Sequence, residues 1–189
     1  MAEDKRVRRT KKLLRQALAE LMQEKEFQNI TVSDVVRRAD INRGTFYAYY
    51  RDVFDLREKV ENEMLDTLYA AADEYLIGPN DFTIQPLIAY AVGYLLDNYD
   101  LVYALLRDSG IGSFEDKLMG FMEACSRKLR PPRSQEDCFA IWFAAAGSIG
   151  LLKKWMTQPE PAPREAGIRR MDELLCRILN TVQHGGCCL

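Results

Sequence analysis

A short run of residues that begins at Arg43 has side chains suited to reading DNA bases. Arg43 is able to make a bidentate contact with guanine O6 and N7, which contributes about 1–3 kcal/mol of discrimination between bases. Thr45 offers a hydroxyl and a methyl group to base edges, and Gly44 is small enough to let a helix lie deep in a groove. Tyr47 and Tyr49 place phenols on the two flanks, at the height of the phosphates. These residue types predict contact with a major groove.

If the segment from Arg43 to Tyr50 is helical, Gly44, Thr45 and Ala48 point to one side, Tyr47 and Tyr49 lie on the two flanks of that side, and Arg43 lies at the helix start. At 100° per residue, Phe46 and Tyr50 point to the opposite side, where they would pack on supporting helices. Core packing alone explains Phe46 and Tyr50 but not the rest, because so short a helix cannot bury all of its sides. We therefore expect an amphipathic helix whose polar face is exposed.

Two earlier helices are expected to position this segment. Leucines at helical spacing between Arg6 and about Lys25 predict a first amphipathic helix. Thr31, with Asp34 three residues later, has the spacing of a cap at the start of a short second helix. The residues Asp40–Asn42 then predict a tight turn. Two short helices joined by such a turn, behind a supporting helix, match the helix-turn-helix plan.

Charge is distributed unevenly along the chain. The 189 residues include 26 Lys and Arg against 28 Asp and Glu, a net charge of −2. Residues 1–60 contain 14 basic and 10 acidic side chains, hence +4, whereas residues 61–189 contain 12 and 18, hence −6. A basic N-terminal segment on an acidic body suits a module that binds a polyanion. Taken alone, a basic run is more often a solvated helix face.

The rest of the chain predicts more helices. Nowhere do β-branched residues alternate over the length of a strand, so the expected fold class is all-α with about nine helices. Breaks at Gly78–Asp81 and Pro131–Pro132 separate some of them. We expect a helix-turn-helix domain at 1–52, a connecting helix at 53–75 and a ligand-binding and dimerisation domain at 76–189.

Other protein classes are disfavoured by the sequence. The single histidine, His184, lies near the end, and no phosphate-binding glycine motif is present, so we predict neither an enzyme nor a cofactor. The nearly uncharged run 138–152 is shorter than the roughly 20 residues of a membrane-spanning helix, and the charged start does not resemble a secretory signal. We expect a cytoplasmic protein with reduced cysteines. His184, Cys187 and Cys188 lack a fourth ligand, so no metal site is predicted.

Three stretches, Ile30–Val35, Ala39–Tyr47 and Tyr49–Asp52, resemble the DNA-binding domain of tetracycline-repressor-like (TetR family) transcriptional regulators. The resemblance covers about residues 5–60. It implies phosphate contacts at the start of the second helix, groove contacts from the third and a backbone contact just after it. The residues so implied are Thr31, Ser33, Arg43, Gly44, Thr45, Tyr47, Tyr49 and Arg51. Family members commonly have Lys where this chain has Val53, so we expect Arg51 to supply that backbone contact.

The segment Gly147–Trp155 resembles the penultimate helix of a subgroup of this family that is common in Gram-positive bacteria. In that subgroup the last two helices pair with their copies in a four-helix dimer interface. Apolar side chains and small residues here agree with such pairing, because small residues let a partner helix approach closely. The expected interface comprises Phe139, Phe143, Gly147, Gly150, Leu175, Ile178 and Leu179. The alternative is that these residues form the core of a monomer.

Aromatic and methionine side chains on the middle helices predict an apolar pocket for a hydrophobic or aromatic small-molecule effector. The residues expected to line it are Tyr90, Tyr94, Tyr103, Phe114, Leu118, Met119, Met122 and Trp142. Residues of these types at helical spacing are equally well explained as core. No acid–base pair among them indicates a charged ligand.

The function expected from these features is that of a homodimeric DNA-binding regulator, more specifically a repressor released by its effector. Its two recognition helices would enter the half-sites of a pseudo-palindromic operator about 34–36 Å apart, or a multiple of this. The alternative is a helical adapter that acts mainly through a protein partner. The sequence specifies neither the operator nor the effector, the regulated genes, the sign of regulation or a role for Cys187 and Cys188.

Overall fold

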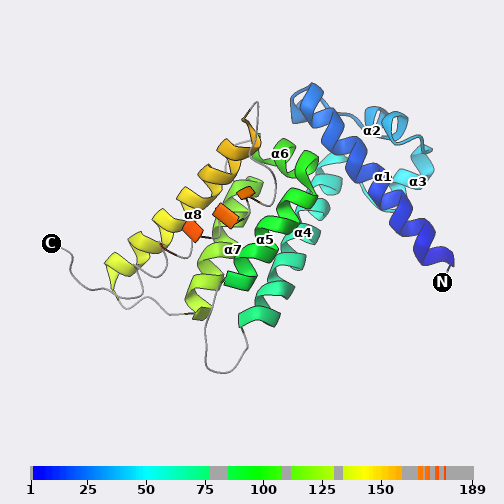
Figure 1. The fold of residues 1–189 in the computed structure, drawn as a ribbon. Helices are drawn as coiled ribbons and strands as arrows, with labels where there is room; N and C mark the ends of the chain where they lie inside the picture. Colours follow the sequence, from blue (N-terminus) through cyan, green and yellow to red (C-terminus); the bar gives the residue numbers. More distant parts are fainter. Residues whose placement is uncertain are drawn as a thin grey trace. The chain divides into compact units, whose positions relative to one another are not determined.

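The computed structural model describes residues 2–76, 85–107, 112–129 and 134–158, and beyond them residues 166–167, 169–170, 173–174 and 177. Within these ranges the protein is all-α, as the sequence predicts, with eight α-helices, one 3-10 turn and no strand (Figure 1). The ninth helix expected near the end falls on the last of these ranges, and the residues described there are helical.

The elements follow one another with short connections. In chain order they are α1 (Ala2–Glu24), the 3-10 turn (Phe27–Asn29), α2 (Val32–Arg38), α3 (Arg43–Tyr47), α4 (Val53–Leu76), α5 (Gln85–Asp97), α6 (Tyr99–Arg107), α7 (Phe114–Leu129) and α8 (Gln135–Met156).

The chain forms two compact units. The first comprises Met1–Met64 and Asn98–Phe114, and the second comprises Leu65–Asp97 and Glu115–Leu189. The continuous helix α4 therefore contributes to both units. Helix α6 belongs to the first unit, where it packs against α1 although nearly eighty residues separate them in the sequence (Figure 1). The division of roles between residues 1–52 and 76–189 stays a prediction.

Each unit has its own apolar core. In the first unit the fully buried side chains include Leu14, Leu18, Val35, Phe46, Leu56, Val60, Val102 and Leu105, which come from five different helices. In the second unit the buried side chains of Leu68, Leu118, Phe121, Ile149 and Leu152 come from α4, α7 and α8. Such burial of leucine and phenylalanine side chains contributes about 1.5–3 kcal/mol for each one.

Two helix boundaries differ from the sequence-based expectation. Helix α1 begins at Ala2 rather than Arg6, and α3 ends at Tyr47 rather than Tyr50. After Tyr47 the backbone tightens, since the N–H of Tyr49 donates to the carbonyl of Phe46 at 3.0 Å in a three-residue turn. Three residues later Asp52 caps α4 by accepting the N–H of Asp55 at 2.8 Å, so the chain must reverse before that point.

None of the helices described is long and apolar enough to cross a membrane. Among the described residues no group of three or more His, Cys, Asp and Glu side chains is placed to hold a metal ion. His184, Cys187 and Cys188 lie outside the described residues.

Candidate nucleic-acid interface

Helix α2 begins with the capping box that the sequence predicts. The Thr31 hydroxyl accepts the N–H of Asp34 at 3.2 Å, and the Asp34 carboxylate accepts the N–H of Thr31 at 3.0 Å. Lys25 also donates to this carboxylate, at 2.7 Å. The hydrogen bond from Lys25, followed by those from Thr31, lowers the pKa of Asp34 well below its usual value. The Asp34 carboxylate therefore bonds to groups of the protein itself and fixes where α2 starts.

The turn between α2 and α3 depends on two polar residues. Asp40 adopts a left-handed backbone conformation with φ of 52°, which aspartate tolerates better than most residues because it can hydrogen-bond locally. Asn42 then caps α3, its side-chain oxygen accepting the N–H of Thr45 at 2.7 Å. The turn predicted at Asp40–Asn42 is thus confirmed, and it fixes the direction of α3.

Helix α3 has one buried and one exposed face, as expected from its periodicity. Phe46 is fully buried and Tyr50, just beyond the helix, is 3% exposed. Tyr47 is 54% exposed, whereas Thr45 and Tyr49 are half-buried. Gly44 and Arg43 are also exposed, so every groove-facing candidate on α3 reaches the surface. Their contact with DNA stays a prediction.

The start of α2 lies beside the start of α3. The Arg43 guanidinium donates to the hydroxyl of Ser33 at 2.5 Å, so two candidate contact residues from different helices are joined directly. Thr31, two residues before Ser33 and at the cap of α2, is exposed. The residues for which the family resemblance implies phosphate contacts (Thr31 and Ser33) therefore adjoin Arg43, for which it implies a groove contact.

Two basic side chains, Arg51 and Lys59, lie near position 53 beyond α3, and the contact of Arg51 with the DNA backbone stays a prediction. Val53 is 4% exposed and belongs to the core, so this position offers no contact to DNA. The side chain of Arg51 is 81% exposed, with Nη2 at 3.3 Å from the buried carboxylate of Asp55. Lys59 donates to the same carboxylate and to the carbonyl of Tyr49, both at 3.0 Å. Sequence reasoning missed Lys59, although its spacing of four residues from Asp55 was a signal.

The basic residues of α1 lie on two different faces of the helix. Lys11 and Arg15 both donate to the carboxylate of Glu63 on α4, at 2.8 and 2.6 Å. Lys5, Arg9 and Lys12 occupy a different side of the helix by its 100° repeat, and all three are exposed. The first unit therefore presents a row of outward cations on α1 that is separate from its internal ion pair.

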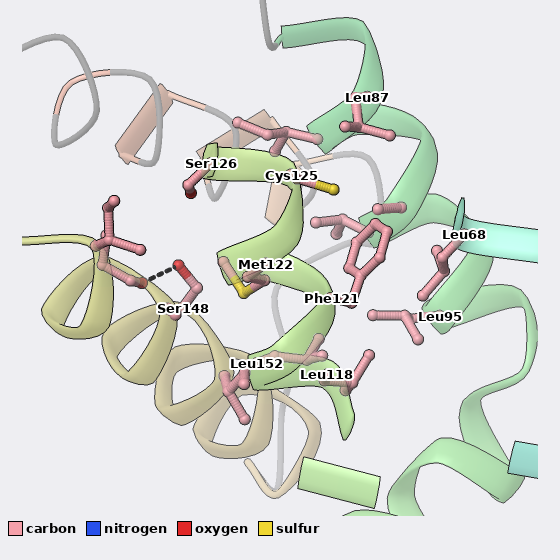
Figure 2. A pocket seen from close by; sticks show the side chains of 17 residues that line it. Leu68, Leu87, Leu95, Leu118, Phe121, Met122, Cys125, Ser126, Ser148 and Leu152 are labelled. Atoms are coloured by element: carbon pink, nitrogen blue, oxygen red, sulfur yellow. Dashed lines mark hydrogen bonds between the residues drawn. The ribbon is translucent and has the colours of Figure 1, made fainter. Parts of the chain in front are cut away.

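The second unit contains an apolar cavity of about 110 Å³ between α4, α5, α7 and α8 (Figure 2). Its polar groups are few: the thiol of Cys125 and the hydroxyls of Ser126 and Ser148. The Ser148 hydroxyl already donates to the carbonyl of Ala144 at 2.5 Å. Burial raises the pKa of the Cys125 thiol to about 11, so this group is neutral and unreactive near pH 7. The aliphatic and aromatic walls are formed by Leu68, Leu87, Ile88, Ala91, Val92, Leu95, Leu118, Phe121, Met122, Ile141, Ala144, Ala145, Ile149 and Leu152.

The effector residues expected from the sequence are dispersed. Leu118 and Met122 line the cavity, whereas Tyr90 and Trp142 are 38% and 45% exposed. Tyr103 and Phe114 belong to the first compact unit, where Phe114 is fully buried. Tyr94 stacks on Tyr90 with ring centroids 6.3 Å apart, and Met119 is half-buried; neither is among the cavity-lining residues. The walls are mainly aliphatic because the tyrosines occupy outer helix faces.

The residues expected at a dimer interface lie on the outer face of α8. Phe139 and Phe143 are 56% and 73% exposed, and Gly147 and Gly150 are exposed one and two turns further. Apart from the adjoining helix backbone, a Cβ atom added to either glycine would meet no atom of the described residues within 4 Å. Packing within the protomer therefore does not require glycine at these positions. Leu175, Ile178 and Leu179 lie outside the described residues.

Residues 14–57 match the model of the family described as bacterial regulatory proteins, tetR family. The HTH-type transcriptional regulator YxbF of Bacillus subtilis (strain 168), which bears the description uncharacterized, is 26% identical over 180 residues, 91% of this chain and 46% of its own length. The HTH-type dhaKLM operon transcriptional activator DhaS of Lactococcus lactis is 33% identical over 67 residues, 35% of this chain and 36% of its own length. The chain thus spans about half, or less, of the length of these curated relatives.

A solved structure agrees with the fold along almost the whole chain. A TetR transcriptional regulator from Streptococcus agalactiae 2603V superposes with a TM-score of 0.58 at 23% identity, covering 93% of this chain and 98% of that one. At this identity the likeness shows a shared all-α fold. The matched family and these relatives are regulators rather than enzymes, which agrees with the absence of a catalytic motif in the sequence.

Proposed function

We propose that this chain is a regulator of the tetR family, whose model its residues 14–57 match, and that it is a homodimeric repressor that leaves its operator when a small molecule binds. One observation supports DNA recognition above all others. On α3, Phe46 is fully buried while Tyr47 next to it is 54% exposed, so this short helix is anchored on one side and presents Arg43, Thr45 and Tyr47 on the other. A polar helix face of this kind suits insertion into a major groove.

Direct DNA binding is tested by selection followed by a salt titration. Duplexes would be selected from a random library with the full-length protein, and affinity for the selected sequence would be measured between 50 and about 300 mM salt. Direct binding requires the logarithm of the affinity to fall with the logarithm of the salt concentration by about 0.9 for each phosphate neutralised. Selection of no duplex would contradict the proposal and favour the adapter, which acts mainly through a protein partner.

Dimerisation is supported by the outer face of α8. Large apolar side chains exposed at Phe139, Trp142 and Phe143 are followed along the helix by Ala146, Gly147 and Gly150, which leave room for a second helix. Two copies would present two recognition helices to a two-fold symmetric operator. The selected duplexes should then contain inverted repeats. A single, unrepeated motif would contradict a dimer on DNA.

The apolar cavity supports release by a neutral, lipophilic effector. None of the described residues that line it is charged, so a carboxylate or an ammonium group beside them would lose hydration without gaining a charged partner. An apolar cavity of about 150 Å³ in another protein accepts a ligand of the size of benzene. Leu68, which lines the cavity, is on α4, and the first residues of α4 lie at the end of the helix-turn-helix segment. An effector that favours a different tilt of α4 would lower DNA affinity by a coupling free energy of about 1–3 kcal/mol.

Matched pairs of small molecules test this effector class. Toluene and 1-hexanol would be compared with benzoate and hexanoate, since each pair shares a carbon skeleton and differs in charge. The neutral compounds should raise the melting temperature and weaken operator binding, whereas the anions should do neither. Ala145→Leu, which places a larger side chain in the cavity wall, should abolish the response. Equal responses to neutral and anionic compounds, or to wild type and variant, would contradict this site.

The direction of regulation is proposed from the way in which the effector acts. The related DhaS protein is named as an activator, so a repressor is proposed here because a ligand that removes a protein from its operator most simply ends repression. A reporter gene placed behind the selected operator decides the sign. Loss of expression on deletion of the regulator would show activation instead.

A further inference from the structure

A direct hydrogen bond links Arg43 and Ser33. Nη2 of Arg43 donates to Oγ of Ser33 at 2.5 Å, and the two residues belong to the first turns of α3 and α2 respectively. Arg43 is exposed and Ser33 is half-buried, so the link lies on the surface that presents the groove-facing residues.

We propose that Ser33 is a positioning residue for base recognition: its hydroxyl holds the Arg43 guanidinium in the orientation that a guanine requires. The inference rests on the proposed function, since it concerns how that DNA surface discriminates between sequences. It assigns to Ser33 a role in specificity that acts through Arg43, in addition to any phosphate contact of its own.

Hydrogen-bonding capacity permits both roles at once. A guanidinium has five N–H donors, so one bond to Ser33 leaves four for a bidentate contact with guanine O6 and N7. A hydroxyl that accepts a hydrogen bond still has its own proton, which is free to point toward a phosphate oxygen. One serine can therefore fix the register on the backbone and orient the arginine that reads a base. Prior orientation of a flexible side chain reduces the conformational freedom that is lost on binding.

The link is not needed to hold the two helices. Helix α2 is capped by Thr31 and α3 by Asn42, so each helix start already has its own side-chain cap. Helix α2 is further fixed to α1 by Arg38, which donates to Glu20 and Glu24 at 3.1 and 2.8 Å. Loss of the Ser33 hydroxyl should therefore leave the fold and the melting temperature nearly unchanged, which makes its effect on recognition measurable.

The link itself is tested on the free protein. Rotation of the Arg43 guanidinium about its Cζ–Nε bond would be measured by ¹⁵N NMR in wild type, Ser33→Ala and Ser33→Thr. We expect faster rotation in Ser33→Ala and wild-type behaviour in Ser33→Thr, which retains a hydroxyl. The same rate in all three proteins would overturn the proposal without reference to DNA.

The effect on recognition is tested by a double-mutant cycle on the selected duplex and on duplexes altered at each guanine. Ser33→Ala should reduce discrimination at one guanine by about 3- to 10-fold, a part of what a full bidentate contact supplies. In an Arg43→Ala background, Ser33→Ala should change affinity for all duplexes equally, because nothing remains for Ser33 to position. Ser33→Thr should restore discrimination.

Two outcomes would overturn the inference while leaving the proposed function intact. A uniform loss of affinity in Ser33→Ala, with discrimination unchanged, would make Ser33 only a phosphate anchor. A gain in discrimination would show that the hydroxyl competes with the base for Arg43. Failure of the wild-type protein to select any duplex is a different result, because it removes the proposed function and this inference with it.

Discussion

At the scale of single residues, neighbouring positions on α3 have opposite roles, because the helix repeat turns one inward and the next outward. Thr45→Ala and Tyr47→Phe should each weaken operator binding about 5-fold, the equivalent of one hydrogen bond of roughly 1 kcal/mol, with little change in melting temperature. Both are measured by binding titrations and thermal denaturation monitored by circular dichroism.

Phe46→Ala is the matched contrast for these two variants. Its side chain is fully buried, so truncation should cost about 3–5 kcal/mol of unfolding free energy and remove binding through loss of the fold. A large fall in melting temperature for Thr45→Ala or Tyr47→Phe would place those side chains in the core and contradict the orientation of α3.

Tyr50 should make the stability of the protein decrease at alkaline pH. Burial, as the largest cause, raises the pKa of Tyr50 to about 12 in the folded protein, above about 10 in an unfolded chain. Its contribution to stability is therefore complete below about pH 10 and is lost as pH rises toward 12, because the unfolded chain releases the proton first. Urea unfolding at intervals from pH 8.5 to 11.5 should show this decline.

Tyr50→Phe isolates that contribution from those of other groups with raised pKa values, among them Cys125, Tyr69 and Tyr99. Over the same pH range the variant should lose less stability than wild type. Parallel curves for the two proteins would mean that the phenol of Tyr50 ionises equally in both states.

At the scale of elements, α1 separates cations that stabilise the protein from cations offered to a partner. Arg9 lies on the exposed side, whereas Lys11 is bound to Glu63. Arg9→Gln should make the salt dependence of DNA binding shallower by about 0.9, the value for one phosphate contact. Lys11→Gln, on the same helix and with the same change in charge, should leave that slope as it is.

The comparison is made by fluorescence anisotropy on the selected duplex and on an unrelated one. Because phosphate contacts are independent of sequence, Arg9→Gln should weaken binding to both duplexes alike. Equal slopes for Arg9→Gln and wild type would mean that Arg9 does not contact a phosphate.

At the scale of the whole molecule, local sequence signals predicted the helices and turns, whereas the packing of distant helices determines which residues line the cavity. The cap at Thr31, the turn at Asp40–Asn42 and the two faces of α3 follow from residue types a few positions apart. The cavity could not be predicted in this way, because its walls come from four helices distant in sequence. Tyr90 and Trp142 are residue types that often line pockets, but each lies on a solvent-exposed face of its helix.

Dimerisation is also a property of the whole molecule. Substitutions at two glycines can separate an effect on dimerisation from an effect on folding. Gly147 on α8 and Gly120 on α7 are both exposed and helical, and apart from the adjoining helix backbone an added Cβ would meet no atom of the described residues within 4 Å at either site. Gly→Ala at each should therefore stabilise the protomer by up to about 1 kcal/mol through helix propensity. Only Gly147 lies on the apolar face of α8 that we propose for the dimer.

A side chain at position 147 should thus keep a partner helix at a distance. Gly147→Leu should weaken dimerisation by at least about 5-fold, from an overpacking cost of roughly 1–3 kcal/mol, and Gly147→Ala by less. Gly120→Ala and Gly120→Leu should leave the dimer unchanged. Sedimentation equilibrium at several protein concentrations measures each dissociation constant. If Gly147→Leu dimerises as tightly as wild type, the two copies meet elsewhere, and the exposed phenylalanines of α8 need another partner.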